Sequence, residues 1–339
     1  MTRCDATEAN TIHKRILTIA LDRLDRHIPF FMGAVTPPDG FEIKALEVGL
    51  AEAKPYRDGM DRHGRMFREK AFDICEQSLS SYIIAKSRGA PFTACPVFPR
   101  RLFSQSCMFV NVDAGIEEPS DLVGKKVGIN SFQTTLCVLA KGDLKFEYKV
   151  PWEEIRWFVQ REEELSWENS TGVSVQSIPG NKEAGQMLVD GELDAYFHPF
   201  PPPVIYRRSD RVRRLFPDTR SEAIRYFKKY GYCPIMHLMV FPQELVEQEP
   251  ALPKATIDMW NEARLLTESY YEDPGYSLLL FGRNDIEAQH ESLRADPWSS
   301  GLSANRENLE NFIRYVADQG LIDEPVPVES LFHASVLDT

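Results

Sequence analysis

The chain has 339 residues, of which 43% are hydrophobic and 27% are charged, a composition typical of a globular protein long enough to form two lobes. Its formal net charge of −12 argues against a general nucleic-acid binder, because such a protein needs a basic surface. This acidic average still allows a small anionic ligand, since a few arginines in a cleft can reverse the field locally.

The amino-terminal segment, MTRCDATEANTIHKR, contains no apolar stretch of the kind found in secretory signals, and it carries Asp5 and Glu8. No apolar run elsewhere in the chain reaches the length of a membrane span. We therefore expect a cytoplasmic protein that has no membrane partner.

Strands alternate with helices along the chain, and this alternation predicts parallel β-α-β units in an α/β fold. In the first third, we expect strands at 16–21, 41–47, 72–75, 92–98 and 107–112, a polar helix within 56–70, and a helix that starts near Ser80. In the middle third, we expect strands at 126–129 and 193–197, helices at 131–140 and 183–189, and a stiff proline-rich loop at 199–203. The remainder should contain a strand at 235–241 and helices at 255–272, 276–281 and 306–319, the last capped by Ser303.

Two polar turns lie where a strand ends and a helix begins, which is where open α/β sheets bind ligands. The first turn follows strand 72–75 and carries Glu76, Ser78, Ser80 and Ser81. The second follows strand 126–129 and carries Gln133, Thr134 and Thr135, after a helix start at Ser131. Helix starts present free N–H groups that suit a carboxylate or a phosphate. Ordinary helix capping would explain the same residues, and the sequence alone leaves that alternative open.

Arg100 and Arg101 follow strand 92–98, and arginine is the side chain best shaped to bind a carboxylate with two hydrogen bonds. A solvated surface doublet is the alternative interpretation. His237 interrupts an apolar strand, and histidine titrates near neutral pH, which suits proton transfer. A hydrogen-bonded core histidine is the alternative there. His198, at the end of strand 193–197, is a weaker candidate.

The sequence contains no GxGxxG, Walker, GxSxG or HExxH motif, so nucleotide-binding, serine-hydrolase and zinc-protease functions lack support. The cysteines form no CxxC pair and no zinc-type cluster, and we expect free thiols. Their positions are Cys4, Cys75, Cys95, Cys107, Cys137 and Cys233. We expect no metal, although a divalent metal held by His27, His198, His237 and carboxylates stays open.

Several segments in order resemble those of one protein family. They are FDICEQSLSSY (72–82), PVFPRRLFSQS (96–106), DLVGKKVGI (121–129), GELDAYF (191–197), VRRLFPD (212–218), PIMH (234–237) and DPWSSGLSANR (296–306). On these segments the chain resembles the 4,5-dihydroxyphthalate decarboxylase family. In the loop at 22–27 only Asp25 and Arg26 match the family pattern, and Leu24 stands where the family has a tyrosine.

The resemblance implies a two-lobed type II periplasmic-binding-protein-like α/β fold with two crossover segments and a ligand cleft between the lobes. We expect one lobe to contain residues 14–112 and 235–339, and the other to contain residues 113–234. A homo-oligomer is possible. A cleft between two such lobes can close over a ligand by a hinge motion.

The resemblance also implies an aromatic-acid decarboxylase without an organic cofactor, acting on a small anionic aromatic substrate such as 4,5-dihydroxyphthalate. The alternative is a solute-binding protein of the same fold that does no chemistry. We expect His237 to donate a proton to the ring and Glu76 to accept the hydroxyl proton, with the reverse assignment open. The departing carboxylate should lie in a less polar region near Phe98 or Trp298. The expected substrate-binding residues are Arg26, Ser78, Ser80, Ser81, Arg100, Arg101, Gln133, Thr134, Thr135, His198 and Trp298.

Overall fold

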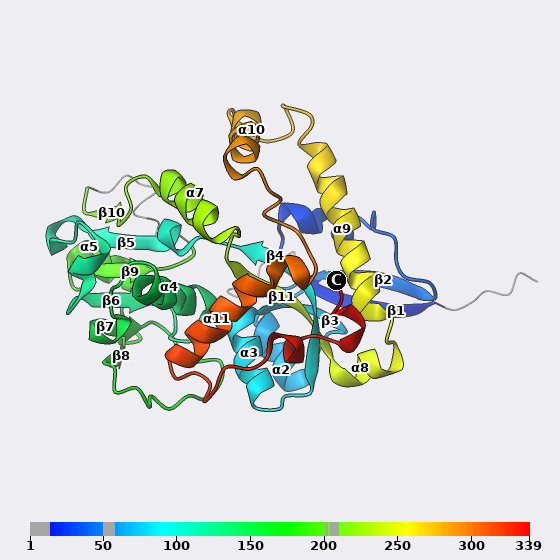
Figure 1. The fold of residues 1–339 in the computed structure, drawn as a ribbon, viewed down its shortest axis with the longest axis horizontal. Coiled ribbons are helices and arrows are strands. Elements are labelled where there is room, and N and C mark those ends of the chain that lie inside the picture. Colours follow the sequence, from blue (N-terminus) through cyan, green and yellow to red (C-terminus); the bar gives the residue numbers. More distant parts are fainter. Residues whose placement is uncertain (1–13, 50–57, 201–202, 204–209) are drawn as a thin grey trace, which may run out of the picture.

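A computed structural model describes residues 14–49, 58–200, 203 and 210–339. Within these residues the strands form two sheets with helices packed around them, in two lobes (Figure 1). None of the helices in this part of the chain is long and apolar enough to cross a lipid bilayer. Cys4, the amino-terminal segment, the start of the expected helix at 56–70 and part of the loop at 199–203 lie outside the described residues.

The first sheet has the strand order β2-β1-β3-β11-β4. Its strands are β1 (Arg15–Leu21), β2 (Phe41–Glu47), β3 (Ile74–Ser78), β4 (Phe92–Arg101) and β11 (Ile235–Pro242). Strand β1 is parallel to β2 and β3, whereas β11 is antiparallel to β3 and β4. The sheet is therefore mixed, and the late strand β11 lies between two early ones.

The second sheet has the strand order β10-β5-β9-β6-β7-β8. Its strands are β5 (Met108–Asn111), β6 (Lys126–Ile129), β7 (Arg156–Val159), β8 (Val175–Ser177), β9 (Ala195–Phe197) and β10 (Val212–Arg214). Strand β5 pairs with β9 and β10, so the chain enters this sheet before Met108. The expected lobe boundary after residue 112 is corrected accordingly, since an apolar strand carries no mark of the sheet that it joins.

The helices pack around the two sheets and on one another (Figure 1). They are α1 (Ile28–Phe31), α2 (Arg62–Glu69), α3 (Leu79–Ser87), α4 (Thr135–Phe146), α5 (Ala184–Asp190), α7 (Thr219–Tyr230), α8 (Gln243–Gln248), α9 (Leu252–Tyr270), α10 (Gly282–Leu293) and α11 (Arg306–Asp318). Helix α11 packs against α4, where Gly142 leaves room for the ring of Tyr315. The carboxyl-terminal part of the chain therefore contacts both lobes.

Two expectations about the last third are wrong. Residues 276–281 form a turn, because the Ser277 hydroxyl accepts the N–H of Leu279 at 3.1 Å, and the helix there begins only at Gly282. Leu278 in that turn is fully exposed. Ser303 does not cap α11, since it lies in a 3-10 turn (Ser303–Asn305) that precedes the helix.

Candidate active site

A cavity of about 380 Å³ lies between the two lobes and is lined by residues from both of them. The first lobe contributes Asp61, His63, Ser78, Ser81, Arg100, Leu102, Met236 and His237. The second contributes Asn130, Ser131, Gln133, Thr134, Thr135, Leu136, Arg161, Glu164, His198, Pro199 and Phe200. The cavity therefore brings together histidines, carboxylates and two arginines beside a few apolar side chains.

His237 and Glu76 form a hydrogen-bonded pair at this cavity. They lie on the antiparallel neighbours β11 and β3, and His237 Nδ1 is 2.5 Å from Glu76 Oε1. The other carboxylate oxygen, Oε2, accepts the backbone N–H of Asp22 at 2.9 Å and lies 3.2 Å from an Arg62 guanidinium nitrogen. Glu76 is completely buried and does not line the cavity, whereas His237 does. Glu76 therefore stands behind the histidine.

The two members of this pair have different protonation states. Burial alone would raise the pKa of Glu76, but the Arg62 guanidinium and His237 beside it hold that pKa well below its usual range. Burial lowers the pKa of His237 to about 4, against the attraction of Glu76. At neutral pH, a neutral His237 therefore donates its Nδ1 proton to an ionised Glu76. Its Nε2 is then the ring nitrogen left to accept a proton, on a residue that lines the cavity.

Proline residues explain how His237 comes to lie beside Arg100. On β4, Arg100 lies opposite His237, but the next regular pair along the two strands is Cys95 with Met239. The irregular stretch between them contains Pro96 and Pro99, which cannot donate ladder hydrogen bonds. Bulges of this kind re-aim side chains near functional sites. The PVFPRR segment is therefore a structural determinant of the site.

The adjacent arginines of β4 have different surroundings. Arg100 lines the cavity, where it donates to Asp22 Oδ2 at 3.0 Å and lies 3.9 Å from Glu76 Oε1. Arg101 is buried elsewhere, since successive side chains of a strand point to opposite faces. It donates to the carbonyl oxygens of Cys233 and Ser299 and to the side chain of Asn305. Of the two, only Arg100 is placed to meet a ligand.

Arg26 and Trp298 lie together but outside the cavity lining. The Arg26 guanidinium stands over the Trp298 ring at 4.4 Å, and its Nε donates to the carbonyl of Pro99 at 2.5 Å. Phe98 is buried in the hydrophobic core against Phe332. The expected apolar region for a departing carboxylate is therefore corrected: the cavity's apolar lining is Leu102, Leu136, Met236, Pro199 and Phe200.

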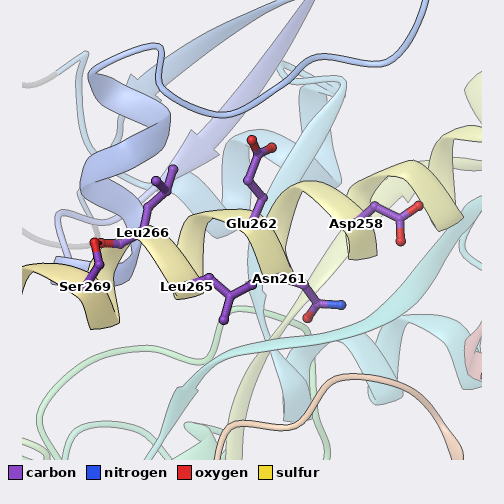
Figure 2. Close-up of a pocket in the computed structure, with 6 residues that line it drawn as sticks. All are labelled: Asp258, Asn261, Glu262, Leu265, Leu266 and Ser269. Atoms are coloured by element: carbon purple, nitrogen blue, oxygen red, sulfur yellow. The ribbon is translucent and has the colours of Figure 1, made fainter.

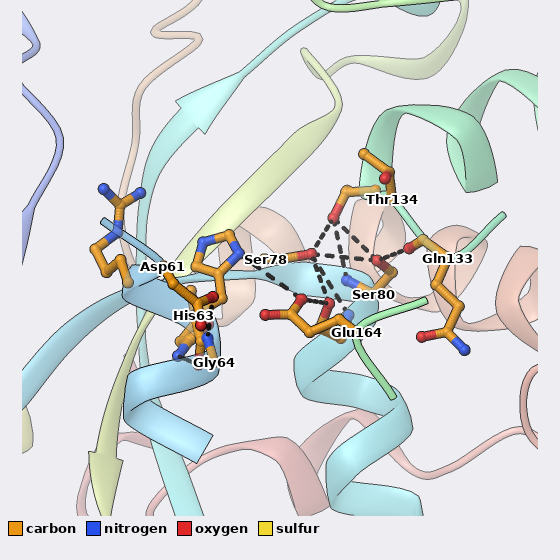
Figure 3. Close-up of polar contacts among 12 residues, drawn as sticks. Asp61, His63, Gly64, Ser78, Ser80, Gln133, Thr134 and Glu164 are labelled. Carbon is orange, nitrogen blue, oxygen red and sulfur yellow. Dashed lines mark hydrogen bonds and ion pairs between the residues drawn. The ribbon is translucent and has the colours of Figure 1, made fainter. Parts of the chain in front are cut away.

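The starts of α3 and α4 meet across the two lobes (Figure 3). Ser78 caps α3, and its hydroxyl lies 2.8 Å from that of Thr135, the first residue of α4. Ser80 is fully buried and donates its backbone N–H to the Thr135 hydroxyl at 3.2 Å and its own hydroxyl to the carbonyl of Gln133. Ser80 thus joins the lobes and does not line the cavity.

Helix α4 begins four residues later than the sequence predicts. Ser131 precedes it, with its hydroxyl 2.9 Å from that of Thr134. The backbone N–H groups of Phe132 and Gln133 donate to the Glu163 carboxylate at 2.6 and 2.9 Å. That turn therefore already binds a carboxylate of the protein itself. Gln133, Thr134 and Thr135 line the cavity, but the Gln133 amide is bound to the backbone of Leu165, to which it donates at 2.8 Å and from which it accepts at 3.3 Å.

His63 from the first lobe and Glu164 from the second also line the cavity. His63, from α2, packs edge-on against His237 with ring centroids 5.3 Å apart. Its Nδ1 is 3.9 Å from Glu164 Oε2, and that oxygen accepts the Ser81 hydroxyl at 2.8 Å (Figure 3). Burial lowers the pKa of His63 well below its usual value. Burial also raises the pKa of Glu164, against the hydrogen bond from Ser81.

Sequence reasoning missed His63, Arg161 and Glu164. Arg161 and Glu164 belong to an acidic run, REEEL, that is indistinguishable in sequence from a solvated surface. Arg161 is exposed, lines the cavity from the second lobe and makes no ion pair with any residue that the structure describes. It adds a second cation to the cavity, and it comes from the lobe that does not contain Arg100. No local sequence signal would have found these three residues, because the fold alone brings them to the cavity.

His198 lines the cavity with its ring stacked on Tyr196, and its Nδ1 is 2.9 Å from the Phe200 carbonyl oxygen. Burial lowers the pKa of His198. His27 lies outside the cavity lining, and its Nδ1 is 2.7 Å from the carbonyl oxygen of Asp22. Among the described residues, no three His, Cys, Asp or Glu side chains are grouped in a way that could hold a metal ion. The three histidines considered for a metal site are therefore not gathered.

A second hollow of about 470 Å³ lies along α9 (Figure 2). It is lined by Asp258, Asn261, Glu262, Leu265, Leu266 and Ser269. All six residues come from one helix and none is a cation, so this hollow does not suit an anionic ligand. The cavity between the lobes is the better candidate for an active site.

The sequence is similar to those of two proteins named 4,5-dihydroxyphthalate decarboxylase. It is 31% identical over 332 residues to the protein from Comamonas testosteroni, and this match covers 95% of the chain and 98% of that protein. It is also 31% identical over 175 residues to the protein from Pseudomonas putida, which covers 50% of the chain and 68% of that protein. No protein-family model matches the chain.

The structure resembles those of periplasmic sulfonate-binding proteins. The aliphatic sulphonate binding protein SsuA of Escherichia coli has a TM-score of 0.56 at 13% identity, covering 94% of this chain and 92% of that one. SsuA of Xanthomonas axonopodis pv. citri, bound to MOPS, has a TM-score of 0.55 at 11% identity, covering 94% of this chain and 98% of that one. The predicted two-lobed periplasmic-binding-protein-like α/β fold is thereby confirmed. At these identities the likeness concerns the fold alone.

Proposed function

The chain belongs to the 4,5-dihydroxyphthalate decarboxylase family, and we propose that it releases carbon dioxide from 4,5-dihydroxyphthalate or a closely related hydroxylated aromatic acid. The observation that carries this proposal is the His237–Glu76 pair, with the histidine in the wall of a cavity that also contains Arg100. The pair supplies acid–base chemistry, and the arginine supplies a counter-charge for an aromatic dicarboxylate.

The chemistry requires a route for electrons into the ring. Direct loss of carbon dioxide would leave an unstabilised aryl anion, whereas a hydroxyl para to the departing carboxylate can push electrons into the ring as it loses its proton. Neutral His237 is suited to accept that proton through Nε2. Glu76 is shielded from the cavity, so we assign it the role of holding the His237 tautomer instead of the expected direct contact with substrate.

Binding of the substrate is assigned to groups from both lobes. Arg100 and Arg161 are the cations of the cavity, and the hydroxyls of Ser78, Thr134 and Thr135 are additional hydrogen-bonding groups. These groups would hold the carboxylate that stays on the ring. The departing carboxylate would face the apolar lining, because strong binding of its charge in the ground state would oppose its loss.

Because the ring hydroxyl itself supplies the electrons, we propose that no organic cofactor takes part. Purified protein should keep its activity after dialysis against a metal chelator. Activity that is lost on dialysis and restored by a divalent ion would add a metal to the mechanism.

The decisive experiment is turnover of 4,5-dihydroxyphthalate by purified protein. Carbon dioxide should be released, and chromatography should identify 3,4-dihydroxybenzoate, the product of losing one carboxyl group. The variant His237→Gln should lower kcat by about 10²–10⁴-fold, the range for one acid–base group, while calorimetry still detects substrate binding. Binding without turnover by the wild-type protein, over a panel of hydroxylated aromatic acids, would contradict the decarboxylase and favour a solute-binding protein.

A further inference from the structure

We propose that Glu164 is the acid that protonates the ring carbon bearing the departing carboxylate, so that each lobe supplies one partner in the proton transfer. This inference rests on the function proposed above and deepens it. His237 is placed to take a proton from the ring hydroxyl, which leaves the proton donor to the ring carbon unassigned. Glu164 is the carboxylic acid in the same cavity that is held beside a histidine.

The position of Glu164 depends on contact between the lobes. It lies in the segment between β7 and β8 of the second lobe, yet its Oε2 accepts the hydroxyl of Ser81 from α3 of the first lobe at 2.8 Å. The same oxygen lies 3.9 Å from His63 Nδ1. His63 in turn packs edge-on against His237. A ring bound against this wall can therefore meet His237 and the Glu164 carboxyl together.

The surroundings of the two glutamates push their protonation in opposite directions. Glu76 stays ionised because of Arg62 and His237, whereas burial raises the pKa of Glu164. The hydrogen bond from Ser81 lowers that pKa, as do Arg161 and Arg68, while Asp61 raises it and His63 beside it is held neutral by burial. Ionised Glu76 thus supports His237 as the base, while the raised pKa of Glu164 suits it to act as the acid, and environments that push pKa values apart in this way are typical of acid and base roles.

The proposed step balances without an oxidant or a reductant. His237 Nε2 takes the hydroxyl proton, the oxygen forms a C=O bond, and ring electrons form a C–H bond with the proton of Glu164. The C–C bond to the carboxylate then breaks, its electrons restore the aromatic ring, and carbon dioxide leaves. His237 returns its proton to the ring oxygen, and Glu164 is reprotonated from solvent. Each turnover thus consumes one proton.

The test compares Glu164→Gln and Glu164→Asp with the wild-type enzyme on 4,5-dihydroxyphthalate. Glu164→Gln should lower kcat by about 10²–10⁴-fold and leave the dissociation constant, measured by calorimetry, within a few-fold. Glu164→Asp should restore part of the activity. In the wild type, kcat should fall as the pH rises through the pKa of Glu164, and this alkaline limb should shift in Glu164→Asp, a readout that holds even if the glutamine variant fails to fold.

Glu162→Gln is the matched control, since Glu162 is exposed in the same acidic run and does not line the cavity. Its kcat should equal that of the wild type. A Glu164→Gln enzyme that keeps kcat within about threefold would overturn this proposal while leaving the decarboxylase intact. Absence of carbon dioxide release by the wild-type protein would overturn both.

Discussion

Two adjacent arginines differ in function because a strand sends alternate side chains to opposite faces. Arg100 lines the cavity beside His237, while Arg101 joins β4 to Cys233, at the junction before β11, and to Ser299 and Asn305. The guanidinium of Arg101 is nearly enclosed, and burial lowers its pKa to about 10. Arg100 is therefore the one proposed to bind the ligand, whereas the contacts of Arg101 are structural.

Arg100→Ala and Arg101→Ala should accordingly fail in different ways. Arg100→Ala should weaken binding of 4,5-dihydroxyphthalate by about 2–5 kcal/mol, because a carboxylate in the cavity loses its counter-charge. Arg101→Ala should lower the midpoint of thermal unfolding and leave the affinity of the remaining folded protein unchanged. Calorimetry and a thermal melt on each variant measure the two effects. Wild-type affinity in Arg100→Ala would remove this arginine from the site.

The buried ion pair of Arg62 with Glu76 gives stability a distinctive dependence on pH. Both side chains are fully buried, 3.2 Å apart. The folded-state pKa of Glu76 lies well below its unfolded value of about 4.3. Its contribution to stability is therefore present above about pH 4.3 and is lost only as the pH falls through the lower, folded pKa. That contribution depends on Arg62 more than on any other charged neighbour.

In the variant Arg62→Met, the ionised Glu76 should destabilise the fold instead of stabilising it. Without the guanidinium the buried carboxylate is uncompensated, so the folded pKa of Glu76 rises and the free energy of unfolding falls by about 3–5 kcal/mol at pH 7. The loss should shrink at pH 5, because protonation relieves the buried charge. Denaturant titrations at pH 7 and pH 5 measure the free energy of unfolding. Arg68→Met removes an exposed pair with Asp61 from the same helix and should cost less than about 1 kcal/mol at either pH. Equal losses for Arg62→Met at the two pH values would contradict this account.

At the scale of elements, the sequence predicts those strands whose hydrophobic pattern is set by burial. Strands β2 and β6 coincide with their expected ranges, and β11 differs by one residue. The short strands β7, β8 and β10 were not expected, since three or four residues leave no readable period. Helix α7 was also missed. Its mixed charged and aromatic sequence hides the two residues that it buries, Tyr226 and Phe227.

The candidate site was predictable where it lies at strand ends and unpredictable where it depends on contact between lobes. Ser78, Arg100 and His237 lie in three segments that carry the family resemblance. The pairing of β11 with β3 and β4 brings these segments together in the first sheet. Glu164 and Arg161 lie in a loop that contains no regular secondary structure. Their place at the cavity follows from how the second lobe packs on α3, and single-sequence reasoning has no access to that packing.

At the scale of the whole molecule, the site and the joint between the lobes share the same residues. Ser78 and Ser80 contact Thr135, and Ser81 contacts Glu164, so hydrogen bonds cross between lobes beside the cavity. If the lobes opened, these hydrogen bonds would break and Glu164, the proposed acid, would move away from the first lobe. Closure around a ligand and assembly of the proton donor are therefore one event in the proposed mechanism.

The cysteine thiols that the structure describes are buried in both lobes, so their reactivity measures how far each lobe is folded. Each of the cysteines in the described residues is free and buried, and they are spread over the first sheet (Cys75, Cys95), its junctions with the second (Cys107, Cys233) and α4 (Cys137). Burial raises the pKa of Cys137 to about 11 and those of Cys107 and Cys233 to about 12. Thiolate is the reactive form, so these groups are protected both by enclosure and by protonation.

A Cys4→Ser protein, purified without reductant, should therefore react slowly with a thiol reagent at pH 8 while it is folded. This substitution removes the cysteine that lies outside the described residues. All five remaining thiols should react at once in denaturant, and mass measurement should show no disulfide. Because a buried thiol reacts only after its surroundings open, the slow native rate should fall further when 4,5-dihydroxyphthalate binds between the lobes. Fewer than five reactive thiols in denaturant would reveal a disulfide that the structure does not contain, and fast reaction of the folded protein would contradict the burial on which this prediction rests.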